Sequence, residues 1–499
     1  MSPSCAPLPV PRRARCAASV VAALLALAGA AGCRGTGGAG DAPPTGAIVV
    51  VVDALRADHL GTYGYERATS PRLDAFARDA MRFDSALTPA PWTLPAMGTL
   101  WTSLYPSVHG AVRRSDEITY ILDRAKFRPT GVLAEAHVTL AEVLREHGFA
   151  TAAFIDGCYP GKVFGFGQGF DLLVEDDLYG ARLNGEALLA WLDATRPKRF
   201  FAYLHVIEVH SPYTPPGVPI ELQGRDDEAT RRVLRVLEEE RQRYAQWNFD
   251  PDYTGTIDGS EPTLEPLRTA APPPRDAAHV AALYDRGIAY TDYWLGHLID
   301  ELKRRGLYDQ TVLVVTADHG EELFDHGRLD HSRTFYEEIM RIPLIMRVPG
   351  RGIGRTSKTQ VGLIDVMPTL LDVLGVPYTG TMQGKSLGPL LDGAPFPDRV
   401  FFGEADQGYR LVAMRTNQMK YVQDLNGHNR EAYDLVKDPE ERKNICTISP
   451  TMCAPFATTV SQWRAEMAQA KAALQVGPAP TAVIDAQTRE RLKALGYDP

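Results

Sequence analysis

Uninterrupted apolar runs alternate with helical patterns along much of the chain. Residues 47–52 read AIVVVV and are followed by an acid, Asp53; such a run is typical of a strand buried on both faces of a parallel sheet. Residues 149–155, 199–207 and 311–316 have the same character. Residues 283–304 instead place apolar side chains on one helical face. This alternation predicts an α/β fold with a large, mainly parallel sheet.

The pattern also divides the chain. We expect a main α/β domain over residues 47–390, in which Thr139–Glu142 forms a capping box for a short helix that Gly148 ends. Residues 222–276 resemble an insertion, with a charged surface helix followed by a loop rich in Pro, Gly and Asp. Short, turn-rich strands predict a small C-terminal subdomain over 391–446. Residues 447–499 are expected to form a tail with short helices.

The first 33 residues differ from the rest. Three arginines precede an uncharged apolar run, which ends in small residues and Cys33. This is the pattern of a secretory signal, and Cys33 resembles the lipidated cysteine of a bacterial lipoprotein. Residues 34–46 then form a flexible Gly- and Pro-rich tether. We expect an exported protein, lipid-anchored to the membrane and facing the periplasm or exterior, with plain cleavage or an uncleaved anchor as alternatives.

Composition adds two limits. The chain has 499 residues, of which 44% are hydrophobic and 23% charged, as in ordinary globular proteins, and a formal net charge of −9 that gives no basic surface for nucleic acid. Cys446 and Cys453 lie in one loop-like stretch and are candidates for a local disulfide in an oxidising compartment. Cys158 is then left over as a buried thiol.

Polar residues follow the predicted strands where ligands of open α/β sheets bind. Asp53 ends the first strand, and Asp318 and His319 follow the strand over 311–316. His205, Glu208 and His210 lie at or after the strand over 199–207. These segments, together with Thr93, predict a site of carboxylates, imidazole and hydroxyl for one divalent cation, which is Ca²⁺, Mn²⁺, Mg²⁺ or Zn²⁺.

Thr93 is the candidate nucleophile at this site. A bound cation lowers the pKa of a coordinated hydroxyl, which activates a weak nucleophile. The helix expected to begin near Leu94 would direct its N-terminal amides at the same point and favour an anion such as sulfate or phosphate. Each residue also has a structural alternative: Thr93 as the cap of the helix, Asp53 as the cap of a turn, and His210 as a hydrogen-bond partner of the backbone.

Several ordered motifs resemble the sulfatase family of the alkaline phosphatase superfamily. They include IVVVVDALRADHLGTYGY, FFAYLHVIEVHSPYTPP, TVLVVTADHGEELFDHG and LIDVMPTLLDVLGVP, and they extend over about residues 47–446. The resemblance implies an alkaline-phosphatase-like three-layer sandwich with a small C-terminal subdomain. It also implies metal-dependent hydrolysis of sulfate or phosphate esters.

The resemblance assigns roles to individual residues. Asp53, Asp318 and His319 match metal ligands, and Thr93 matches the nucleophile, which also contacts the metal. His210 matches a histidine that contacts the anionic group or the leaving oxygen. His331 lies near the position where sulfatases place a lysine for the same purpose.

The chain departs from the family pattern at the nucleophile. Sulfatases of this type carry Cys or Ser in a Cys/Ser-x-Pro-x-Arg motif that is converted to formylglycine, whereas this chain has Thr93 and, at the arginine position, Met97. Oxidation of threonine would give a ketone in place of the aldehyde. Ala54 replaces the second acid often found beside the first ligand. Arg56 is a candidate substrate-binding cation in place of the missing arginine, with a salt-bridged arginine as its alternative.

We therefore expect a metal-dependent ester hydrolase that uses an unmodified, metal-bound Thr93, with His210 and His331 as catalytic and substrate-binding residues. The expected partner is a sulfated or phosphorylated small molecule, glycan or lipid head group. One alternative is a phosphodiesterase or phosphoglycol-type transferase that acts on glycans or lipid head groups. Another is a degenerate, non-catalytic binding protein that keeps the fold.

Overall fold

The structure is a computed structural model. It describes residues 43–112, 130–157, 159–175, 180–211, 213, 274–406, 410–427, 429–477, 479–486, 488–489 and 492. The predicted signal, Cys33, Cys158 and the charged helix of the insertion lie outside these residues. The described residues belong to one compact unit, Pro43–Pro499. Within them, no helix has both the length and the apolar character needed to cross a bilayer.

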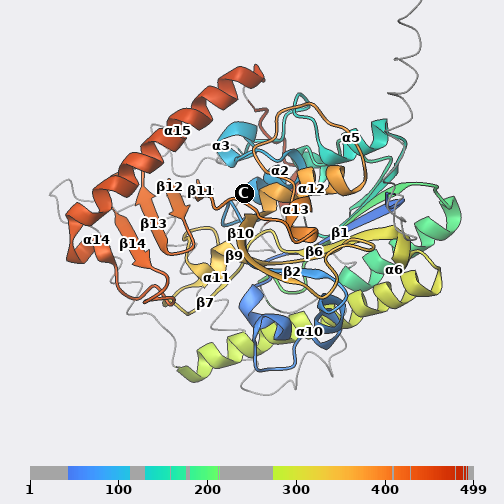
Figure 1. Cartoon of the computed structure of the whole chain (residues 1–499), viewed down its shortest axis with the longest axis horizontal. Coiled ribbons are helices and arrows are strands. Elements are labelled where there is room, and N and C mark those ends of the chain that lie inside the picture. Colours follow the sequence, from blue (N-terminus) through green and yellow to red (C-terminus); the bar gives the residue numbers. More distant parts are fainter. Residues whose placement is uncertain are drawn as a thin grey trace, which may run out of the picture. The chain divides into compact units, whose positions relative to one another are not determined.

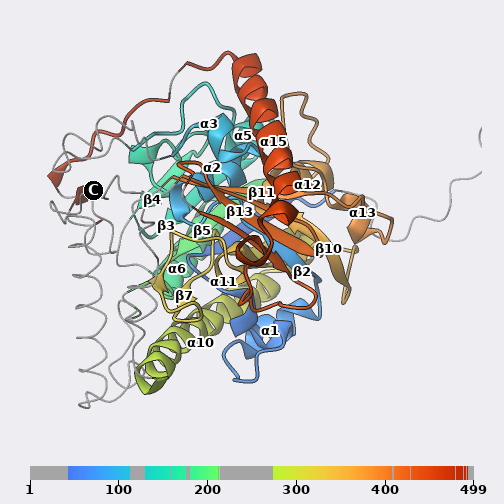
Figure 2. The ribbon, with the colours of Figure 1, turned by 90° about the vertical axis from the view of Figure 1, so that its left-hand side faces the viewer.

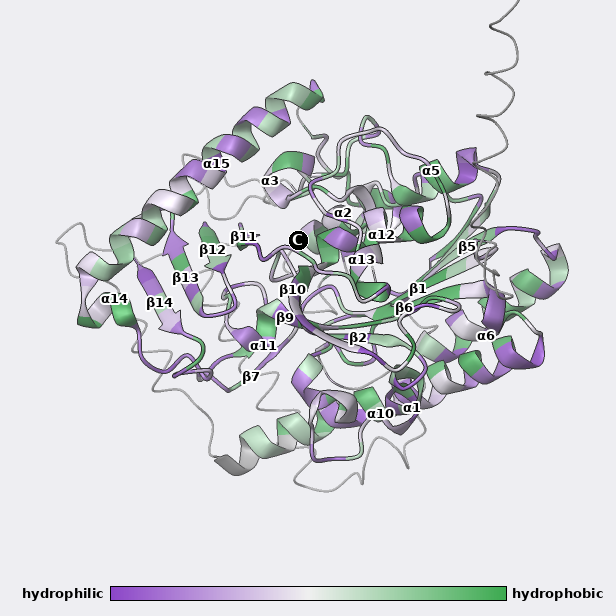
Figure 3. Cartoon of the chain, in the orientation of Figure 1, coloured by the Kyte–Doolittle hydropathy of each residue, from purple (hydrophilic) through white to green (hydrophobic). Residues whose placement is uncertain are grey.

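An eight-stranded sheet forms the centre of this unit, in the order β10-β2-β9-β6-β1-β5-β3-β4. Seven strands are parallel and β9 runs in the opposite direction. The strands are β1 (Gly46–Val52), β2 (Met81–Leu87), β3 (Ala150–Ile155), β4 (Leu172–Glu175), β5 (Phe200–Val206), β6 (Thr311–Thr316), β9 (Arg341–Arg347) and β10 (Thr356–Gly362). The four strands predicted from apolar runs are confirmed to within one residue, and β1, β5 and β6 are buried along their whole length. The green of β1 and β6 in Figure 3 shows their apolar character.

Helices cover both faces of the sheet, which gives the expected three layers (Figures 1 and 2). One layer contains α1 (Pro71–Ala77), α6 (Gly180–Thr195) and α10 (Pro274–Arg304). The other contains α2 (Thr93–Thr102), α5 (Leu140–Glu146) and α12 (Val366–Val373). The predicted capping box of α5 is confirmed: the Thr139 side chain accepts the Glu142 N–H, and Glu142 accepts the Thr139 N–H. The helix predicted over 283–304 begins earlier, at Pro274, a residue well suited to a first helical turn.

A small antiparallel sheet follows the main one in sequence. Its strands are β11 (Phe401–Ala405), β12 (Leu411–Arg415), β13 (Met419–Asp424) and β14 (Arg430–Asp434). Shorter elements complete the described fold: α3 (Pro106–His109), β7 (Glu322–Leu323), β8 (Leu329–Asp330), α11 (Glu337–Met340), α13 (Gly388–Leu391) and α14 (Ile445–Ile448).

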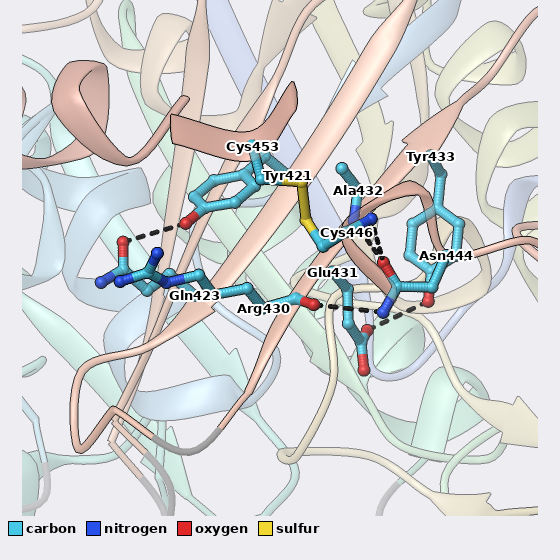
Figure 4. The surroundings of a disulfide bond; sticks show 9 residues. All are labelled: Tyr421, Gln423, Arg430, Glu431, Ala432, Tyr433, Asn444, Cys446 and Cys453. Atoms are coloured by element: carbon cyan, nitrogen blue, oxygen red, sulfur yellow. Dashed lines mark hydrogen bonds between the residues drawn. A yellow bond between two sulfur atoms is a disulfide. The ribbon is translucent and has the colours of Figure 1, made fainter. Parts of the chain in front are cut away.

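The C-terminal tail differs from the prediction. Helix α15 (Ala454–Leu474) has 21 residues, so the expectation of short helices there was wrong. The helix is held by tertiary packing, since Trp463 stacks on Phe402 of the small sheet with ring centroids 4.3 Å apart. Cys446 and Cys453, just before it, form a disulfide (Figure 4). Beside this bond the Asn444 side chain accepts the backbone N–H groups of Cys446 and Ala432.

Candidate active site

The carboxyl ends of neighbouring parallel strands bring the predicted site together. Strands β5 and β6 flank β1, and Val51 is in register with both His205 and Thr316. Asp53 and Asp318 therefore leave the sheet at the same edge, one directly after β1 and the other two residues after β6. Thr93 reaches this edge as the first residue of α2, which follows β2.

Three of the predicted metal ligands converge in the interior. His319 Nε2 lies 3.4 Å from Asp53 Oδ1 and 3.4 Å from Asp318 Oδ2. The same nitrogen lies 3.3 Å from the Thr93 hydroxyl. All four side chains are almost completely buried. The structure thus places Asp53, Thr93, Asp318 and His319 in one cluster, as the sequence predicted.

The donor set of this cluster fits a cation. His319 Nδ1 lies 2.8 Å from the Gly320 carbonyl, so Nδ1 carries the hydrogen of the neutral ring and Nε2 presents a lone pair. Burial lowers the pKa of His319 to about 3, which keeps the ring neutral. Asp53 Oδ1 and Asp318 Oδ2 have no hydrogen-bond donor within the described part of the chain. Two buried carboxylate oxygens and an imidazole lone pair that face one another need a positive charge between them.

The two carboxylates are in different electrostatic environments. Burial, and then the nearby charge of Asp318, raise the pKa of Asp53. Burial also opposes ionisation of Asp318, but the pKa of Asp318 is lowered, and the backbone N–H groups that donate to it are among the causes. Asp318 Oδ1 accepts the backbone N–H groups of His319, at 2.9 Å, and Ala54, at 3.3 Å. Asp318 is therefore the carboxylate that the protein itself stabilises as an anion.

The backbone directly after Asp53 is strained. Ala54 has a φ of 60°, in the left-handed region that costs a residue with a Cβ about 1–2 kcal/mol. This turn directs the Ala54 N–H at Asp318. The position where the family often has a second acid thus contributes a backbone donor to the site.

His210 and His331 also lie at the cluster. The His331 ring centroid is 4.2 Å from that of His319 and 4.9 Å from that of His210. Burial, and then the neighbouring His331, lower the pKa of His210 to about 4, and its Nδ1 lies 2.6 Å from the Ser211 carbonyl. His331 Nδ1 instead faces two carboxylates, Glu321 at 3.2 Å and Asp330 at 2.9 Å.

Arg56 is a salt-bridged arginine, which was the alternative to its expected role as a substrate-binding cation. Its guanidinium pairs with Asp58 at 2.7 Å and with Asp325 at 2.6 Å, and it also donates to the Glu321 carbonyl. These contacts tie the loop after β1 to the loop after β7 and occupy the group that was expected to bind substrate. We therefore do not place Arg56 among the substrate-binding residues.

Thr93 does not cap α2 through its side chain, as its structural alternative required. The N-cap residue is Trp92, with extended backbone, and no side chain caps the helix. Thr93 is the first helical residue, and its hydroxyl points at His319. The arginine of the family motif is replaced by Met97, which is completely buried and whose sulfur accepts the Tyr203 hydroxyl at 3.7 Å.

Two further groups at the site received no role from the sequence. His205 Nε2 lies 3.6 Å from Asp53 Oδ2, while its Nδ1 lies 2.9 Å from the Asp156 carbonyl. Glu321 is completely buried, and burial raises its pKa to about 7. Glu321, Asp330 and His331 form a second group of possible ligands beside the first. His205 lies at the carboxyl end of β5, so its sequence position indicated that it would be close to the site. Glu321 lies five residues after the end of β6, and only the folded path of this loop brings it close to the site.

Comparisons with known proteins agree with this arrangement. The model of the sulfatase family matches residues 46–376, and the model of the N-sulphoglucosamine sulphohydrolase C-terminal region matches residues 324–466. Arylsulfatase K of Rattus norvegicus is 30% identical over 185 residues, which cover 34% of this chain and 33% of the relative. Arylsulfatase K of Danio rerio is 30% identical over 185 residues, which cover 35% of each protein. These alignments thus span about a third of the curated relatives.

Solved structures show the same fold over most of the chain. Phosphonate monoester hydrolase of Agrobacterium radiobacter has a TM-score of 0.64 at 20% identity and covers 85% of this chain and 96% of its own. A protein solved with its substrate, D-glucosamine-2-N,6-O-disulfate, has a TM-score of 0.63 at 20% identity and covers 86% and 98%. Because the family model matches more than half of the chain, from the first strand of the sheet to beyond the cluster, the chain belongs to the sulfatase family of the alkaline phosphatase superfamily.

Proposed function

We propose that the protein is a metal-dependent hydrolase that cleaves sulfate or phosphate esters and uses Thr93 as its nucleophile. The convergence of the Thr93 hydroxyl with His319 Nε2, Asp53 Oδ1 and Asp318 Oδ2 carries this proposal. Two buried carboxylate oxygens without donors in the described residues, Asp53 Oδ1 and Asp318 Oδ2, lie beside this hydroxyl, as expected of a nucleophile that a cation activates.

Asp53, Asp318, His319 and Thr93 would hold one divalent cation. When bound, such a cation would supply the charge that stabilises the Thr93 alkoxide and attracts the anionic ester. Oxygen and imidazole ligands suit Ca²⁺, Mn²⁺, Mg²⁺ or Zn²⁺. Sulfatase-family membership and the geometry of the cluster support this assignment.

The reaction follows from the position of Thr93. Its oxygen attacks sulfur or phosphorus, and a Thr93 ester bond forms as the bond to the leaving oxygen breaks. The hydroxyl loses its proton, and the leaving oxygen takes one. Water then hydrolyses the Thr93 ester, which releases sulfate or phosphate and restores the hydroxyl.

His210 and His331 have different roles in the proposed reaction. His210 donates its Nδ1–H to the Ser211 carbonyl, so its neutral ring presents a lone pair at Nε2, and it would contact the anionic group or the leaving oxygen as an imidazolium that the anion stabilises. His331 has two carboxylates at Nδ1, so it is the imidazole suited to carry a proton to the leaving oxygen. It lies near the position where the family places a lysine.

The names of similar proteins support an anionic ester as substrate. Among the structural neighbours are the complex with a disulfated glucosamine, a 2-O glycosaminoglycan sulfatase and a phosphonate monoester hydrolase. We propose a sulfated or phosphorylated small molecule, glycan or lipid head group for this chain. We also propose that the enzyme is exported and anchored through lipidated Cys33, as the N-terminal sequence pattern favours.

A substrate panel tests the proposal. Nitrophenyl sulfate, phosphate and phosphodiester are offered with Mn²⁺, Zn²⁺ or Ca²⁺ to wild type, Thr93→Ala and the matched control Thr102→Ala. Thr102 is also buried in α2, but its hydroxyl donates to Gly98 in the helix. We expect cation-dependent turnover in wild type and the control, and none in Thr93→Ala. Undiminished turnover in Thr93→Ala would refute the nucleophile. Cation binding without turnover of any ester would favour the non-catalytic alternative.

A further inference from the structure

The hydroxyl of Tyr284, on helix α10, bonds to the turn that follows Asp53. It donates to the Ala54 carbonyl at 2.7 Å and accepts the Arg56 N–H at 2.7 Å. Tyr284 is completely buried, as are Ala54 and Arg56. One side chain from a distant segment, 228 residues after Arg56, therefore pairs with both the Ala54 carbonyl and the Arg56 N–H of this buried turn.

The turn needs such support because it contains Ala54 in the left-handed conformation, with a φ of 60°. Residues with a Cβ keep this conformation only when surrounding contacts hold them in it. The turn begins directly after Asp53, so a relaxed turn would also move the Asp53 carboxylate. Its geometry additionally sends the Ala54 N–H to Asp318 Oδ1.

This second bond orients Asp318. Its Oδ1 accepts from Ala54 and from the His319 N–H, so Oδ2 is the oxygen that faces His319 Nε2 at 3.4 Å. The same oxygen has no donor within the described residues. A chain of contacts thus runs from Tyr284 through Ala54 to Asp318 and keeps one carboxylate oxygen available for a cation.

Helix α10 is itself fixed against this loop. Asp285, the next residue, lies 2.7 Å from His59 Nδ1 and accepts from Tyr65 and Arg67, both at 2.8 Å. Further along the helix, Asp292 accepts the backbone N–H groups of Arg72 and Leu73 at the start of α1. The Tyr284 hydroxyl therefore has a rigid base, as an orienting group requires.

We infer that Tyr284 is a positioning residue of the metal site, which holds Asp53 and Asp318 in the orientation that binds the cation. The inference rests on the cation site of the proposed function and adds a residue from outside the ligand set. Loss of the hydroxyl should weaken cation binding about 10–100-fold, the range typical of groups that orient metal ligands.

Tyr284→Phe tests the inference because it removes the hydroxyl and keeps the ring. Divalent-cation affinity of the full chain is measured by competition with a chromophoric chelator, and the melting temperature is measured in EDTA. Tyr63→Phe is the matched control, since the Tyr63 hydroxyl also donates to one backbone carbonyl and accepts one backbone N–H, both of Leu344 in β9. We expect weaker cation binding only in Tyr284→Phe.

A second variant separates positioning from general stability. Ala54→Gly in the Tyr284→Phe background allows the left-handed turn without strain, so it should recover part of the lost affinity and should fold even where the single variant does not. Three results would overturn the inference. The first is a cation affinity of Tyr284→Phe within twofold of wild type, and the second is an equal loss of affinity in Tyr284→Phe and Tyr63→Phe. The third is no recovery of affinity when Ala54→Gly is added to Tyr284→Phe. If wild type binds no divalent cation, the proposed function fails as well.

Discussion

His319 Nε2 lies 3.3 Å from the Thr93 hydroxyl, so a ligand from the end of β6 contacts the first residue of α2. The two residues are separated by 226 positions in the chain. The contact joins the candidate nucleophile to the candidate cation site. In the proposed function this hydroxyl takes the place of the modified residue of many sulfatases.

Replacing Thr93 by Ser and by Val should separate the hydroxyl from the shape of the side chain. Thr93→Val keeps the volume and removes the oxygen, and we expect turnover of the preferred nitrophenyl ester to fall at least about 10³-fold. Thr93→Ser keeps the oxygen and should stay within about tenfold of wild type. Mass spectrometry of rapidly quenched reactions should detect a sulfated or phosphorylated residue 93 in wild type and Thr93→Ser. Equal activity of the Val and Ser variants would contradict a nucleophilic oxygen.

Much of this site was predictable because its residues sit at strand ends. The apolar runs placed Asp53 and Asp318 at one edge of a parallel sheet, and the edge then had to bring them together. The ordered motifs added His210 and His331, whose rings do pack against each other. Local sequence pattern was sufficient wherever a strand or a motif fixed the position.

The remaining features depend on contacts between distant segments. Nothing near Arg56 in sequence indicates that Asp325 pairs with it, so its charge was assigned to the substrate. Nothing near Ala54 shows that the Tyr284 hydroxyl supports its backbone. Helix α15 was underestimated for a similar reason, since Trp463 packs on Phe402 of the small sheet, which lies 61 residues earlier in the chain.

A divalent cation should stabilise the folded protein. Binding at a concentration of 100 times Kd adds about 2.7 kcal/mol to the free energy of unfolding, so the melting temperature should rise with cation and fall with EDTA. Asp318→Asn should abolish most of this rise because it removes the carboxylate that the protein orients. Asp365→Asn is the control: it breaks a buried pair with Arg399 and lowers the baseline, but the rise on adding cation should remain. An unchanged rise in Asp318→Asn would exclude it as a ligand.

Glu322 should make the protein less stable as the pH rises. It is 1% exposed, and burial raises its pKa to about 8, whereas the ordinary value is 4.5. Between these values the folded state keeps a proton that the unfolded state has lost, so stability falls by about 1.4 kcal/mol per pH unit from this group alone. Glu322→Gln should flatten the decline between pH 5 and pH 8 in urea unfolding. Glu186→Gln, at a side chain 48% exposed, should leave the decline unchanged.

The buried Lys420 should be essential for joining the small sheet to the segment after His331. Its Nζ lies 2.8 Å from Glu337 and 2.8 Å from Glu441, and it donates to the Phe335 carbonyl at 2.8 Å. Lys420→Met leaves the buried Glu441 carboxylate without its cation, whereas Glu337 keeps Arg415, and should cost about 3–5 kcal/mol of unfolding free energy. Lys437→Met breaks an exposed pair with Asp434 and should cost less than about 1 kcal/mol. Similar losses in the two variants would refute this assignment.

The arginine of the family's Cys/Ser-x-Pro-x-Arg motif should destabilise this protein if it is introduced at position 97 in α2. Met97 is completely buried against the Tyr203 hydroxyl, so Met97→Arg places a charge where the chain has packed a thioether, and we expect a loss of about 2–4 kcal/mol in unfolding free energy. Met97→Leu keeps the apolar volume and should cost less than about 1.5 kcal/mol.

The same reasoning predicts that residue 93 is unmodified in the native enzyme. A hydrazide probe reacts with aldehydes and ketones alike, so it would detect oxidation of either cysteine or threonine at this position. Peptides that contain Thr93, isolated from active enzyme, should not react and should keep the mass of threonine.

The double variant Thr93→Cys/Met97→Arg restores the Cys-x-Pro-x-Arg pattern and should become reactive in cells that convert such motifs. A reactive carbonyl in wild type would show that the enzyme depends on oxidation after all, and activity would then have to follow the carbonyl content of each preparation. Activity that is independent of any carbonyl leaves the Thr93 hydroxyl as the nucleophile.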